Sequence, residues 1–173
     1  MPCNKPGALL IGIPLAVALA ASTTSWAAAP IRVSGPSPFA NCTIGGPGTI
    51  YVNAEVEPWL AVNPANPSNL IGVWQQDRWS NGGAHGLVAA SSFNGGTNWQ
   101  QTNLPFSACA NGLGYERASD PWVSIGPDGT AYSVSISFNQ SNNNNAVVAA
   151  VSKDGGLSWG NLSVIIADNE PTL

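Results

Sequence analysis

The sequence predicts an all-β fold made of repeated units of four short antiparallel strands, and three observations lead to this prediction. The Glu-Pro-Trp triplet at residues 57–59 returns 63 positions later as Asp-Pro-Trp at 120–122. Apolar and polar residues alternate with a period of two along the segments that follow each triplet. No comparable helical periodicity occurs after residue 27. Repeated four-stranded units are typical of β-propeller blades, which need neighbours to cover both of their faces.

The first unit is expected to span about residues 57–104. Pro-rich and Gly-Gly stretches divide it into alternating segments, as turn-forming residues do between strands. We expect its four strands at 58–62, 70–75, 86–91 and 99–104.

The second unit, about residues 120–167, has the same organisation, with strands expected at 121–125, 130–138, 146–151 and 162–167. In its second strand Tyr132, Val134, Ile136 and Phe138 alternate with serines, which puts all the large groups on one face of a half-buried strand. A third unit opens at Glu170. The sequence therefore predicts residues 51–173 to be part of a propeller, two blades and the start of a third, in a longer protein of six blades or more.

The chain opens with an apolar run that ends in a small-x-small triplet, the pattern of a secretory signal peptide over residues 1–27. We therefore expect a secreted or periplasmic protein without a membrane anchor after cleavage. Residues 28–50 are interpreted as a Pro/Gly/Ser-rich lead-in. Export leaves Cys42 and Cys109, for which an oxidising compartment favours a disulfide; a reduced buried pair is the alternative.

Charge excludes some classes of partner. Five Lys and Arg face nine Asp and Glu, a net charge of −4, and the basic residues form no cluster. Nucleic acid and anionic membranes are therefore not expected as partners. The abundant Asn, Ser and Gly side chains suit neutral ligands that form hydrogen bonds.

The stretch "SKDGGLSW" at 152–159 resembles the Asp-box, Ser-x-Asp-x-Gly-x-x-Trp, of sialidases and other bacterial-neuraminidase-repeat proteins. An earlier copy, "SFNGGTNW" at 92–99, departs from it only by Asn in place of Asp. The matching residues are Ser152, Asp154, Gly156 and Trp159 in one copy and Ser92, Asn94, Gly96 and Trp99 in the other. Asp or Asn can accept backbone hydrogen bonds in a tight turn and tryptophan can cover the blade, so we expect the boxes to be structural.

Up-and-down connectivity places the Asp-boxes on one face of a propeller and the remaining loops on the other, which is where ligand-binding groups are expected. The candidate catalytic or binding residues on that second face are Asp77, Arg78, Glu116, Arg117 and Asp120. Plainer alternatives remain. Asp77 and Arg78 could form a solvated ion pair, and the nearby His85, in a Gly-rich loop, is expected to be exposed and idle.

Glu57, Asp120 and Glu170 occupy equivalent positions, so in a closed ring they would converge toward the central axis. Converging acids could serve glycoside chemistry or hold Ca²⁺ through oxygen ligands, although no other metal site or cofactor is expected. Alternatively, the acid-Pro-Trp openings only satisfy the backbone of a neighbouring blade.

Resemblance to sialidases implies an arginine cluster, an aspartate acid/base and a tyrosine nucleophile assisted by glutamate. In the family, later blades supply the tyrosine and the further arginines. The family's Arg-Ile-Pro stretch near the start is also not found, since Arg32 is followed by Val33-Ser34. We therefore expect a sialidase-like, glycoside-hydrolase-related propeller protein that acts on or binds glycans and is inactive as this chain alone. The competing expectation is a non-catalytic extracytoplasmic propeller that binds glycans or proteins.

Overall fold

The computed structural model describes residues 29–169, and the elements below belong to one compact unit that begins at Ile31. The expected signal peptide at 1–27 and Glu170, the expected start of a third unit, lie outside the described residues. Within the described part, no helix is long and apolar enough to cross a membrane.

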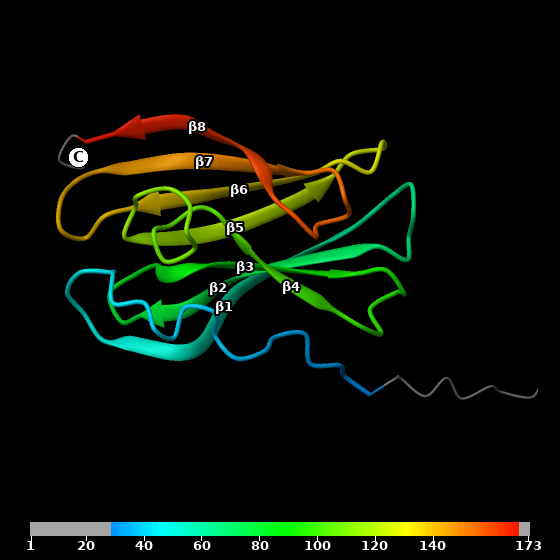
Figure 1. Cartoon of the computed structure of the whole chain (residues 1–173), viewed down its shortest axis with the longest axis horizontal. Coiled ribbons are helices and arrows are strands. Elements are labelled where there is room, and N and C mark those ends of the chain that lie inside the picture. The colour runs from blue at the N-terminus through cyan, green and yellow to red at the C-terminus, as the bar shows by residue number, and fades with distance from the viewer. Residues whose placement is uncertain (1–28, 170–173) are drawn as a thin grey trace, which may run out of the picture. The chain divides into compact units, whose positions relative to one another are not determined.

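The described chain is all-β and contains no helix (Figure 1). Its strands are β1 (Ile50–Val62), β2 (Leu70–Trp79), β3 (Ala84–Ser92), β4 (Gln100–Leu104), β5 (Arg117–Ile125), β6 (Ala131–Phe138), β7 (Asn145–Ser152) and β8 (Gly160–Asp168). All pairings are antiparallel, and the sheet is open.

The sheet consists of two four-stranded halves. The first half-sheet is β1–β4 and the second is β5–β8, each an up-and-down meander. One residue pair, Ala84 with Ala118, links them through β3 and β5. Each of the eight expected strands corresponds to an observed strand, but all except β4 and β6 are longer than expected, most of all β1, β2 and β5.

The two half-sheets share one register. Trp59 pairs with Val73 across β1 and β2, and its counterpart Trp122 pairs with Val134 across β5 and β6. Both β1 and β5 have a register shift immediately before that tryptophan. Bulges of this kind bend a strand and re-aim its side chains, so the repeated sequence reproduces the irregularity as well as the strands.

The main core lies between the half-sheets. Ile71, Val73 and Leu87 from the first half-sheet pack with small residues of the second, such as Ala131 and Val148. Small side chains allow the two sheets to approach closely, and burial of the larger ones supplies the stabilising hydrophobic term.

Strand β6 has the two distinct faces that its alternation predicts, and its serine face is the covered one. Its large residues do share one face, but Tyr132 and Ile136 are exposed, whereas Ser133, Ser135 and Ser137 are buried. The buried hydroxyls are satisfied because each donates to a backbone carbonyl, those of Trp122, Ser119 and Phe106 respectively. The serine face is therefore the side that packs on the first half-sheet.

The lead-in packs against the first half-sheet. Phe39 is buried beside Gly86, where a Cβ would lie only 2.8 Å from the phenyl ring. A disulfide joins Cys42 to Cys109. The sequence Pro-Phe-x-x-Cys occurs at both 38–42 and 105–109, so the repeat extends into the lead-in, a similarity that the sequence reading missed.

Candidate ligand site at the acid-proline-tryptophan repeats

The two Asp-box segments form matching turns. Ser92 Oγ receives the N–H of Gly96 at 2.9 Å, and Asn94 Oδ1 receives the N–H of Asn98 at 2.9 Å. In the second turn Ser152 receives the N–H of Gly156 at 2.8 Å, and Asp154 receives the N–H of Ser158 at 3.0 Å. The glycines at 95, 96, 155 and 156 have φ between 68° and 93°, a region that favours glycine.

Charge is not needed to build this turn, because an amide and a carboxylate fill the same place in it. Burial opposes ionisation of Asp154, but hydrogen bonds from Ser158 and Ser152 outweigh that effect and lower its pKa. The indole of Trp99 donates to the carbonyl of Gly96 at 2.8 Å, which folds the ring back over the turn.

The prediction of an exposed Asp77-Arg78 ion pair is wrong. Asp77 is 0% exposed and accepts hydrogen bonds from Ser37 Oγ at 2.6 Å and from the Asn53 N–H at 2.8 Å. Arg78 donates to the carbonyl of Gly83 at 2.8 Å. These residues lie in β2, which continues to Trp79, and not in a loop.

His85 is likewise buried, in β3, against the expectation of an exposed and idle side chain. Its Nδ1 lies 3.4 Å from Asp77 Oδ2, and its ring packs against that of Trp79 in a T-shaped arrangement. Burial opposes ionisation of Asp77, but bonds from His85, Ser37 and Asn53 lower its pKa overall. This cluster holds the lead-in against the first half-sheet.

Arg117 is fully buried and its guanidinium is occupied. It donates to the carbonyls of Gly45 and Gly82 at 2.6 Å each and to the carbonyl of Pro47 at 2.8 Å. Its guanidinium carbon also lies 4.4 Å from the centre of the Trp79 ring. Arg117 therefore ties the lead-in to the β2–β3 hairpin, and little of it remains to receive a ligand carboxylate.

Glu116 organises the loop between β6 and β7. Its carboxylate accepts the backbone N–H groups of Gln140 at 2.6 Å and Ser141 at 3.1 Å, and also the Ser141 hydroxyl. Burial works against these bonds, but the net effect lowers the pKa of Glu116.

Asp120, the remaining candidate, lines the same hollow as Glu57. The two acid-Pro-Trp triplets together line one hollow of about 250 Å³. Both acids have left-handed backbones, with φ of 54° for Glu57 and 51° for Asp120. That conformation costs about 1 kcal/mol at a residue other than glycine, and such strain concentrates at functional sites.

Stacked indoles form part of the same hollow. The ring centroids of Trp59 and Trp122 lie 3.8 Å apart with 25° between the planes. Trp59 Nε1 donates to the carbonyl of Val123 at 3.1 Å, while Glu57 accepts from the side-chain amide of Gln75. The first triplet thus does bond to the backbone of the other half-sheet, as the plainer alternative expected, and it does so through its indole. The equivalence of the repeats predicted that the two acids would converge, whereas this stack was not predicted, although the repeated tryptophans were its signal.

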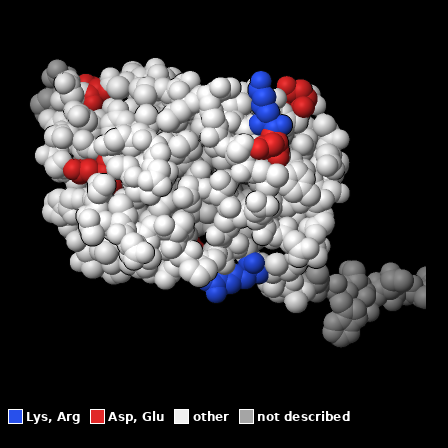
Figure 2. All heavy atoms as spheres, in the orientation of Figure 1, with Lys and Arg blue, Asp and Glu red and all other residues white. Residues whose placement is uncertain are grey.

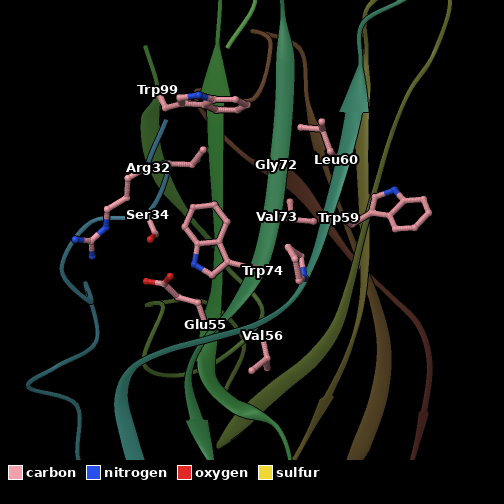
Figure 3. Close-up of a pocket in the computed structure, with 12 residues that line it drawn as sticks. Arg32, Ser34, Glu55, Val56, Trp59, Leu60, Gly72, Val73, Trp74 and Trp99 are labelled. Atoms are coloured by element: carbon pink, nitrogen blue, oxygen red, sulfur yellow. The ribbon is translucent and has the colours of Figure 1, made fainter. Parts of the chain in front are cut away.

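A larger groove of about 590 Å³ borders the hollow on the outer side of the first half-sheet (Figure 3). Trp59, which also lines the hollow, borders it together with Leu60, Trp74 and Trp99. The groove is mainly apolar, with Arg32 and Glu55 at its margin, and it lacks the paired acids. We therefore place the candidate site in the smaller hollow.

Charged groups are sparse on the molecular surface. The face drawn in Figure 2 carries only a few separate charged spots. Among residues 29–169, no group of three or more His, Cys, Asp or Glu could hold a metal ion. The hollow thus offers the carboxylate oxygens of Glu57 and Asp120 beside the aromatic faces of Trp59 and Trp122, and no basic side chain lines it. A comparison of the sequence with protein-family models found no match, and neither did a comparison with curated proteins.

Proposed function

We propose that this chain forms part of a sialidase-like Asp-box β-propeller that works outside the cytoplasm and binds neutral glycans. The observation that carries the proposal is that Glu57 and Asp120 line one hollow with the stacked indoles of Trp59 and Trp122. Carboxylates accept hydrogen bonds from sugar hydroxyls, and aromatic faces pack against the apolar faces of sugar rings.

The propeller part of the proposal is supported by repetition at three levels. The half-sheets share strand order and register, their outer hairpins end in matching turns, and their faces pack on one another. Export is supported by the disulfide between Cys42 and Cys109, since such bonds persist in oxidising compartments.

A neutral ligand is favoured over a sialoside because a sialic acid carboxylate needs cationic partners. Arg117 and Arg78 already donate to backbone carbonyls, and two acids line the hollow. The negative charges of these two carboxylates would repel the negative charge of an anionic sugar.

Hydrolysis of a neutral glycoside is the second candidate function. Glycosidases place two carboxyl groups on either side of the scissile bond, and Glu57 and Asp120 are two carboxyl groups in one hollow. A chromogenic panel of neutral glycosides tests it: turnover by the chain that E57Q and D120N each abolish would favour hydrolysis over binding alone.

The binding proposal is tested on a glycan array, followed by titration of the best-bound neutral glycan and its sialylated counterpart, with tryptophan fluorescence as the signal. We expect the neutral glycan to bind more tightly. E57Q and D120N should each weaken it about tenfold, the order of one hydrogen bond to a charged group. Asp128→Asn, at an exposed turn acid, is the matched control and should bind normally. Preference for the sialylated glycan, or binding unaffected by both variants, would contradict the proposal.

A further inference from the structure

A buried glutamine contacts one of the two acids that line the hollow. Gln75 follows Ile71 and Val73 in β2 at a period of two, so it belongs to the strand face that packs on the second half-sheet. It is 0% exposed, and its Nε2 donates to the carboxylate of Glu57. Its Oε1 is buried and has no hydrogen-bond partner among the described residues. A buried amide whose carbonyl is left unpaired costs the fold free energy.

The second half-sheet has an apolar residue at the equivalent position. Gln75 pairs with Leu87 of β3, and Ile136 pairs with the counterpart of that leucine, Val147 of β7. The repeat therefore accepts an apolar, β-branched side chain at this place, as strands generally do. Because the strand pattern does not call for an amide here, the contact with Glu57 points to a role in the site.

The two acids of the hollow are consequently held in different ways. Glu57 has the amide of Gln75 as a donor, whereas no group within residues 29–169 donates to the carboxylate of Asp120. The apolar Ile136 has no donor to offer in its repeat. An ionised carboxylate has about four lone-pair positions, so Glu57 keeps acceptor capacity for a ligand after it has bonded to Gln75.

We propose that Gln75 is a positioning residue of the glycan site. It holds the carboxylate of Glu57 in one orientation, so that a sugar hydroxyl meets an acceptor that is already in place, while the carboxylate of Asp120 adjusts to the ligand. Fixing a side chain before binding reduces the conformational entropy that binding costs. This inference rests on the proposed function, since it assigns Gln75 to the same hollow.

A packing role is the competing explanation for Gln75, and protein stability without any ligand separates the two. Q75M removes the amide and nearly keeps the length of the side chain. We expect its urea midpoint to equal or exceed that of the parent chain, because the unpaired Oε1 is removed together with the donor.

Q76M is the matched control, because it removes the next amide in the same strand. Gln76 is 1% exposed, and its side chain accepts from Trp74 and donates to Asp77. Its amide is thus paired at both ends, and its loss should lower the urea midpoint. A midpoint that falls as far in Q75M as in Q76M would overturn the positioning role.

Glycan affinity provides the second measurement, made by tryptophan fluorescence with the best-bound neutral glycan of the array. We expect Q75M to weaken binding about fivefold, less than E57Q does, because Glu57 is still present but no longer held. In an E57A background Q75M should change the affinity by less than about twofold, whereas in a D120N background it should again cost about fivefold. Q76M should bind as the parent chain does.

Failure of this inference and failure of the proposed function give different results. If the parent chain binds no neutral glycan, the proposed function fails and the positioning role falls with it. If the parent chain binds and both E57Q and D120N weaken binding, the proposed function stands. An unchanged affinity in Q75M, or an equal loss from Q75M in the E57A background, would then overturn the positioning role alone.

Discussion

Trp59 stacks on Trp122 with their ring centroids 3.8 Å apart, although the two residues are 63 positions apart in the sequence. Each indole belongs to one repeat, so the contact joins the two half-sheets next to the hollow that contains the acids. Both rings remain accessible, at 41% for Trp59 and 51% for Trp122. The stack therefore contributes to stability while leaving aromatic surface for a ligand.

A double-mutant cycle measures the coupling between these two indoles. We expect W59A and W122A each to lower the free energy of unfolding, and the coupling term to be about 1 kcal/mol, as for other aromatic pairs. Urea denaturation of the two single variants and the double variant gives this term. Strict additivity would show that the rings contact without stabilising one another.

Arg117 is predicted to act as a structural tether. Its guanidinium donates to carbonyls from the lead-in and the β2–β3 hairpin, so R117A should reduce the free energy of unfolding by about 3 kcal/mol through unpaired buried groups. R117K should recover only a minor part, because an ammonium group lacks the planar fork of donors. Arg32→Ala, at an exposed arginine, serves as the control in the same denaturation series. Full recovery by lysine would contradict the tether.

The repeat predicted the strands, whereas the roles of individual side chains depended on distant segments. The strand order follows from local alternation and turn residues, which each unit carries in itself. Asp77 was expected in a loop after a strand ending at residue 75, but it lies in β2, and its partners Ser37 and Asn53 come from 40 and 24 positions earlier. No local pattern reveals such pairing. The alternation along β6 likewise separated its two faces without indicating that the serine face is the covered one.

Stability should depend on pH through Asp77. Its pKa is lower in the folded protein than the ordinary value of about 3.9. Ionised Asp77 therefore stabilises the fold above pH 4, and this contribution disappears as the pH falls through the lowered pKa. We expect D77N to be less stable than the parent chain at pH 7 and the difference to shrink below about pH 4. Urea midpoints from pH 2.5 to pH 7 measure it; a constant difference over that range would contradict the prediction.

Reduction of the disulfide should destabilise the fold and loosen the lead-in. The bond closes a loop with a sequence separation of 67 residues, for which the chain-entropy model gives about 4 kcal/mol. We expect the paired substitution of Cys42 and Cys109 by serine to lower the melting temperature, with dithiothreitol having the same effect on the parent chain. Limited proteolysis should then cut first near the lead-in. A melting temperature unchanged by either treatment would show that Phe39, Ser37 and Arg117 hold the segment without the bond.

The two Asp-box turns allow a reciprocal exchange that separates a structural acid from a chemical one. Asn94 and Asp154 accept the same backbone hydrogen bond through Oδ1, so N94D and D154N should each change the free energy of unfolding by less than about 1 kcal/mol, the scale of one turn contact. N94A and D154A remove the acceptor and should destabilise by about 1–2 kcal/mol, as loss of a capping side chain does. None of the four should alter glycan binding, because the acids that line the hollow are Glu57 and Asp120. Loss of binding in D154N, with the free energy of unfolding unchanged, would mean that the turn carboxylate itself contacts the ligand.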